Sequence, residues 1–193
     1  ANVNPSKGDN ADITKLLSSF DANLLIKVKE ARYRNTTIRG AALDATIQSG
    51  EIVIRDLSVV DVGGAALEVT GKLAGTVVEP RTDIKVKITA KSAAKLARFA
   101  GVEVTETVQK LGGFEFQSKV LGSPSSLTVD AVLKIAQARL ETKGVVKPLE
   151  SPIGLDLALK FSHPRVEKFL ARLDKGFADS GLILGPGTLT GAV

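Results

Sequence analysis

The chain of 193 residues contains no cysteine, no methionine and no tryptophan, and only seven phenylalanines and one tyrosine. Without cysteine it has no disulfide and no thiolate metal site, which suits either the cytosol or a bacterial envelope that avoids unpaired thiols. The few aromatic rings argue against a protein that stacks sugars or single-stranded nucleic acid. Because a full-length chain begins with methionine, we expect a processed product or, more readily, a segment of a longer protein, and residues 187–193 read as a strand that is just starting.

Long hydrophobic runs are also missing. No stretch reaches the ~20 apolar residues that a membrane-spanning helix needs, and residues 1–15 lack the core of a signal peptide. We therefore expect any anchor or export signal to lie outside this sequence. The formal net charge is +5, but the 26 basic residues are spread along the chain. Scattered basic residues on alternating strands are typical of a solvated face, so we expect no nucleic-acid partner.

Groups that make or break bonds are scarce. His163 is the only histidine and stands before Pro164, where a cap or turn residue is the simpler interpretation than a general base. Asp56 and Asp61 are spaced across a strand end, which favours turn polarity over an acid–base pair. No glycine-rich segment carries the lysine and hydroxyl residue of a phosphate loop. We predict no enzymatic activity, no cofactor and no metal.

Aliphatic residues that alternate with polar ones make up most of the rest. This period of two predicts β-strands joined by short turns, several of them at glycines. The expected strands cover residues 22–33, 38–47, 51–60, 65–74, 82–89, 114–120, 127–136, 138–146 and 153–161. Short amphipathic helices are expected at 92–99, 103–111 and 165–173. The predicted fold class is mainly β with short helices, built as an antiparallel meander.

The second half of the chain repeats the first at a constant offset of 73 residues. The strand at 83–88 and the helix after it match the strand at 156–161 and its helix (156 minus 83). Residues 67–71 match 140–144 in the same register (140 minus 67). We therefore predict a polar lead-in over 1–19, a first meander-plus-helix repeat over 20–111, and a second over 112–193 that stops at the start of a further strand.

Clean alternation gives the sheet one dry face, and that face has to be covered. Two or three short helices mask only part of eight or nine strands. Two architectures remain open from the sequence. The sheet either folds onto itself as an ordinary sandwich or barrel, or it stays open and leaves an aliphatic groove.

A strand with the sequence GEIVIRDL at residues 50–57 is followed by GGAALEVTGKL at 63–73. Pro80, the DIKV stretch at 83–86 and the helix that begins at Ser92 come next. This order of motifs resembles that of the AsmA-like repeat proteins of the Gram-negative envelope. In the second half, GSPSSL at residues 122–127 is similar to the family's glycine turn, but Ala136-Gln137 replaces its glycine pair.

The resemblance spans the chain from about residue 20 to its end. It implies a periplasmic segment of a protein anchored in the inner membrane, which carries phospholipid acyl chains along an aliphatic groove towards the outer membrane and supports outer-membrane biogenesis. The parent chain would reach both membranes through parts outside this segment. The residues that we expect to line the groove are Leu24, Ile26, Val28, Ile52, Ile54, Leu67, Val69, Ile84, Val86, Ile88, Phe114, Phe116, Leu155, Leu157, Leu159 and Phe161.

Alternative interpretations stay open for these residues. Each groove residue can instead be plain core, and the helix at 165–173 can pack on the sheet or lie on a membrane. Lysine and arginine along the rim can meet phosphate head groups or simply face solvent. As a whole, the module can be a structural or chaperone-like one that contacts other envelope proteins by strand addition.

Overall fold

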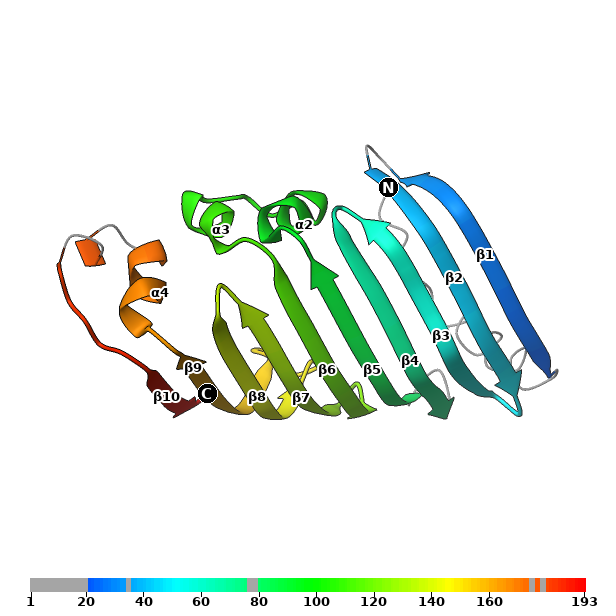
Figure 1. The fold of residues 1–193 in the computed structure, drawn as a ribbon. Helices are drawn as coiled ribbons and strands as arrows, with labels where there is room; N and C mark the ends of the chain where they lie inside the picture. The colour runs from blue at the N-terminus through cyan, green and yellow to red at the C-terminus, as the bar shows by residue number, and fades with distance from the viewer. Residues whose placement is uncertain (1–20, 34–35, 76–79, 174–175, 178–179) are drawn as a thin grey trace.

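A computed structural model of the protein describes residues 21–33, 36–75, 80–173, 176–177 and 180–193. These residues form one ten-stranded antiparallel sheet in which each strand pairs only with its neighbours in sequence (Figure 1). Strands β1 and β10 are the two edges of the sheet. Within the described residues, β1 pairs only with β2, and β10 pairs only with β9. The fold class expected from the sequence is confirmed in its open form, and the closed sandwich or barrel is not what forms.

The strands and helices match the expected segments to within a few residues. The strands are β1 (Ala22–Tyr33), β2 (Thr36–Gln48), β3 (Glu51–Val62), β4 (Ala65–Gly75), β5 (Pro80–Ala90), β6 (Phe114–Ser123), β7 (Ser126–Ile135), β8 (Ala138–Lys147), β9 (Gly154–His163) and β10 (Gly187–Ala192). The helices are α2 (Ala93–Phe99), α3 (Glu106–Leu111) and α4 (Val166–Leu173).

The 73-residue offset is present in three dimensions. Strand β8 begins 73 residues after β4 (138 minus 65), and α4 begins 73 residues after α2 (166 minus 93). The offset continues to the last strand, because β10 begins 73 residues after β6 (187 minus 114). The fold is therefore repeat-like, and one period of 73 residues spans four strands and a helical segment. The domain limits near residues 111 and 112 stay a prediction, and the expected lead-in over 1–19 lies outside the described residues.

Turn conformation is kept between the repeats although the residues differ. Gly63 and Gly64 join β3 to β4 with φ of 60° and 83°. At the matching place between β7 and β8, Ala136 and Gln137 adopt φ of 52° and 70°. Two successive residues with positive φ are the signature of the type I′ hairpin turn, whose twist suits the strands on either side. Ala136 and Gln137 thus replace the glycine pair while the turn keeps the same backbone conformation.

The three helices lie in a row at one end of the strands (Figure 1). Side-chain hydroxyls cap two of them, since Ser92 accepts a hydrogen bond from the Lys95 amide at 3.3 Å and Thr105 one from the Val108 amide at 3.4 Å. Although α3 and α4 belong to different repeats, the Thr107 hydroxyl donates to the Leu173 carbonyl oxygen at 3.4 Å. The row therefore ties one repeat to the next.

The buried core of the described residues is thin and built from small side chains. The buried apolar residues are Ala45, Ile47, Ala65, Ala90, Ala94, Ala131 and Ala138. No large side chain in the described part of the chain is fully buried. A single sheet without a second layer opposite it has this character, because each aliphatic side chain is covered only by its neighbours on the same face.

An open aliphatic sheet face as the candidate functional site

The pairing of the strands brings all sixteen predicted groove residues to one face of the sheet. In β5, burial alternates along the whole strand, with Ile84, Val86 and Ile88 on the covered side and the lysines between them exposed. The register then places Ile88 opposite Leu67 on β4 and opposite Phe116 on β6. The same in-phase pairing continues through every ladder of the sheet.

One row crosses the sheet without a break. It takes one apolar residue from each strand: Val28, Ala41, Val59, Leu67, Ile88, Phe116, Leu133, Leu140, Phe161 and Leu189. Since neighbouring strands are about 4.8 Å apart, this row forms a continuous apolar strip at right angles to the strands. We call the side of the sheet that carries this row and the sixteen residues the aliphatic face.

Side chains of the aliphatic face are only half covered. Ile26 is 49% exposed, Leu155 is 47% exposed, and Leu189 on β10 is 71% exposed. Most of the others are intermediate between buried and exposed. Within the described residues, the only elements packed over this face are the helices at one end. Phe169 of α4 lies there, with its ring 5.1 Å from that of Phe161.

The aliphatic face also has members that the sequence analysis did not name. Leu43, Leu133 and Leu140 lie in the same rows as the predicted residues, and the alternation of their strands was the signal that could have identified them. Two hydroxyl residues, Ser118 and Thr142, interrupt the neighbouring row, which runs through Val86 and Leu159. The buried Thr142 hydroxyl has no hydrogen-bond partner in the described part of the chain.

The opposite face of the sheet is charged and largely paired. Its cross-strand ion pairs include Lys72–Glu51 and Lys87–Glu68, each at 3.1 Å, and Lys134–Glu115 at 3.2 Å. A hydrogen bond to Asp44 raises the pKa of Arg55 on this face. Exposed pairs of this kind contribute little to stability, but they keep this face wet and fix which side of the sheet is apolar.

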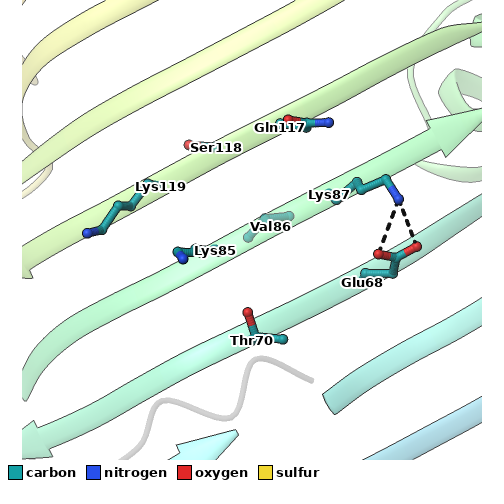
Figure 2. A pocket seen from close by; sticks show the side chains of 8 residues that line it. All are labelled: Glu68, Thr70, Lys85, Val86, Lys87, Gln117, Ser118 and Lys119. Atoms are coloured by element: carbon teal, nitrogen blue, oxygen red, sulfur yellow. Dashed lines mark hydrogen bonds and ion pairs between the residues drawn. The ribbon is translucent and has the colours of Figure 1, made fainter. Parts of the chain in front are cut away.

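A shallow, open hollow of about 350 Å³ lies on this charged face over β4, β5 and β6 (Figure 2). Lys85, Lys87 and Lys119 border it, and the Lys87 ammonium group donates to both carboxylate oxygens of Glu68. The hollow is a shallow depression between the long side chains of three neighbouring strands.

The candidate catalytic residues have structural partners. His163 is buried at 4% exposure, its Nδ1 accepts from the Arg165 amide at 3.0 Å, and its Nε2 lies 3.1 Å from the Ala136 carbonyl oxygen. It is thus a turn and helix-start residue, as the sequence favoured. Asp61 accepts from the Gly64 amide at 3.1 Å, which is the turn role that the sequence favoured. Asp56 instead lies inside β3, where it accepts from the Ser58 hydroxyl at 3.0 Å.

The described residues hold no group of three or more histidine, aspartate or glutamate side chains placed to bind a metal ion. None of its helices has the length and apolar content needed to cross a bilayer. Comparison with protein-family models, with curated proteins and with solved structures found no match to this chain.

Proposed function

We propose that this chain is a segment of an AsmA-like envelope protein and that its aliphatic face carries the acyl chains of phospholipids between the inner and outer membranes. The observation that supports this most is the unbroken row from Val28 to Leu189, one apolar residue from each of ten strands, with no second layer over it in the described residues. A face that is apolar, long and open offers a path rather than a closed pocket.

The mechanism is passive and needs no reactive group. An acyl chain that leaves a bilayer for water loses about 0.8 kcal/mol for each exposed CH₂, so contact with aliphatic side chains lowers the barrier to crossing the periplasm. The head group stays in water beside the sheet. Because the row from Val28 to Leu189 presents an apolar side chain on every strand, an acyl chain that moves from strand to strand meets similar surroundings at each step.

The first test is native mass spectrometry with lipid extraction on the segment after expression in the bacterial envelope. We expect phospholipid to copurify in near-stoichiometric amounts and to survive a salt wash. Protein free of lipid, which also fails to take up phospholipid added in vitro, would contradict the proposal. The alternative, a structural or chaperone-like module that binds envelope proteins by strand addition, would then be favoured. Its binding edge would be β1, an edge strand of 12 residues that is paired on one side only in the described residues.

A matched pair of neighbours tests the face itself. Ile88 and Thr89 are adjacent in β5 and point to opposite sides of the sheet. We expect Ile88→Asp to lose most lipid binding, because it places a charge in the apolar row, whereas Thr89→Asp keeps it. A photo-crosslinking residue at position 88 should label acyl chains and one at position 89 should not. Equal labelling from both positions would show that the aliphatic face is not the path, whether or not the Asp variant folds.

A further inference from the structure

Ion pairs are distributed unevenly between the sheet and the helices. Of the eleven ion pairs among the described residues, only Lys110–Glu106 at 4.0 Å lies in the helical row. Lys95 and Arg98 on α2, and Lys168 and Arg172 on α4, are exposed and take part in none of these pairs. The strands also carry exposed lysines without an ion pair, but these lie on the face opposite the aliphatic one.

The cations of α2 and α4 border the aliphatic face. Ala94 of α2 is buried, and the Phe169 ring of α4 lies 5.1 Å from that of Phe161 on this face. Lys95 and Lys168 occupy matching positions in the two repeats (168 minus 95 is 73). Helices α2 and α4 therefore share one arrangement, with covered apolar residues and an exposed lysine on each.

At the other end of the strands, fewer basic residues are without an ion pair. Arg81 of β5 is exposed and takes part in no ion pair of the described residues. In contrast, Lys72 near the end of β4 pairs with Glu51 at 3.1 Å, and Lys147 at the end of β8 pairs with Glu150 at 3.1 Å. The two ends of the strands consequently differ in charge. The negative head group of an amphiphile is therefore attracted to the end that carries the helices.

We propose that the helical row is a head-group rim, which binds the phosphate of anionic phospholipids while their acyl chains lie on the aliphatic face. This inference rests on the proposed function and adds a lipid class and an orientation to it, with the head group at the helices and the chain pointing along the strands. Each basic residue near an anionic lipid surface contributes roughly a fivefold gain in binding. At physiological ionic strength, screening reduces this gain at exposed sites.

The test compares two fourfold variants with the same change in charge. The rim variant carries Lys95→Gln, Arg98→Gln, Lys168→Gln and Arg172→Gln. The control variant carries Lys27→Gln, Lys29→Gln, Lys85→Gln and Lys143→Gln, four exposed lysines of the strands that also take part in no ion pair of the described residues.

Calorimetry would measure the binding of short-chain phosphatidylglycerol and of phosphatidylcholine with the same acyl chains, each below its micelle concentration. We expect the wild-type chain to prefer phosphatidylglycerol by roughly tenfold at low salt and less at high salt. The rim variant should lose this preference and keep its affinity for phosphatidylcholine, and the control variant should keep both.

The possible results separate the two proposals. Equal binding of both lipids by the wild type, or a preference that survives in the rim variant, overturns the head-group rim and leaves the acyl path in place. Binding of neither lipid overturns the proposed function and the rim together. Glycerol phosphate, which has no acyl chain, should not displace phosphatidylglycerol at equal concentration, and displacement would contradict a lipid as the occupant.

Discussion

Gly144 on β8 lies so close to the backbone of its neighbouring strand that any side chain there would overlap the carbonyl oxygen of Asp156. Gly71 stands in the same relation to Asp83 on β5, 73 residues earlier (144 minus 71). Both glycines have positive φ, 157° and 145°, which other residues rarely adopt. The repeat is therefore marked by a close approach of two backbones as well as by aliphatic alternation.

Substitution of this glycine should destabilise the sheet strongly. We expect Gly144→Ala to lower the free energy of unfolding by about 2 kcal/mol or more, because the new Cβ meets backbone that cannot rotate away and φ is strained. Gly191→Ala on β10 is the control, since nothing lies within 4 Å of its added Cβ. Urea denaturation followed by circular dichroism measures both variants. A Gly144→Ala midpoint equal to that of the control would contradict the close approach.

The turn between β7 and β8 offers a stabilising change. Ala136 and Gln137 hold positive φ at a cost that glycine avoids. Replacing both with glycine should raise stability by about 0.5–1 kcal/mol, after allowance for the greater freedom of glycine in the unfolded chain. The reverse change, Gly63→Ala, should destabilise, because its Cβ would come 2.7 Å from that of Phe99. Thermal melts of the two variants, with shifts of opposite sign, check this prediction.

His163 should matter for stability and not for reactivity. In His163→Ala, the Arg165 amide and the Ala136 carbonyl oxygen both lose a partner, and packing against Phe169 at a ring distance of 5.3 Å is lost. We expect a loss of about 1–3 kcal/mol. His163→Asn, which keeps part of the hydrogen bonding, should lie between this variant and wild type. Lipid binding per folded molecule should stay unchanged in both variants, and a selective loss of binding would point to a direct role.

Acid should loosen the segment that follows α4. Partial desolvation raises the pKa of Glu167, but hydrogen bonds from the backbone, including the Gly185 amide at 3.1 Å, and the charge of Arg165 outweigh it, so the pKa falls below its ordinary value of 4.5. A carboxylate with a lowered pKa stabilises the fold above its unfolded pKa, and this contribution is lost as the pH falls through the folded value.

The Gly185 amide reports on this contact directly. Its NMR shift should follow the protonation of Glu167 below pH 4.5, and Glu167→Gln should abolish the titration. Glu103→Gln, on the loop before α3, serves as a control that leaves the titration intact. A Gly185 signal that does not move between neutral pH and the onset of acid unfolding would contradict the contact.

Strand positions were predictable from the sequence because alternation is a local property. The alternation in β5 predicts both the strand and its covered side, which carries Ile84, Val86 and Ile88. The 73-residue repeat then indicated that the second meander would follow the first, and β8, β9 and α4 do so. The burial of His163 was less accessible, since it depends on a carbonyl group 27 residues away on another turn.

The periodicity of the sequence could not predict whether the sheet closes. An open sheet and a barrel show the same alternation along each strand and differ only in whether the two edge strands pair. Neither edge residue, Val28 on β1 or Leu189 on β10, indicates this from the sequence. Register irregularities, such as the one between Asp44 and Ala45, likewise depend on the partner strand. The charge difference between strand ends became visible only once the helices were placed beside the aliphatic face.

A sheet in which every strand pairs only with its sequence neighbours also has a distinct response to mechanical load. Between Ala22 on β1 and Ala192 on β10, each hydrogen-bonded ladder joins consecutive strands. Tension between these two edges acts across the ladders in series and opens them one after another, since every ladder of the described strands joins sequence neighbours. The segment would therefore yield in many small steps and refold locally, as an elastic spacer does between two points whose separation changes.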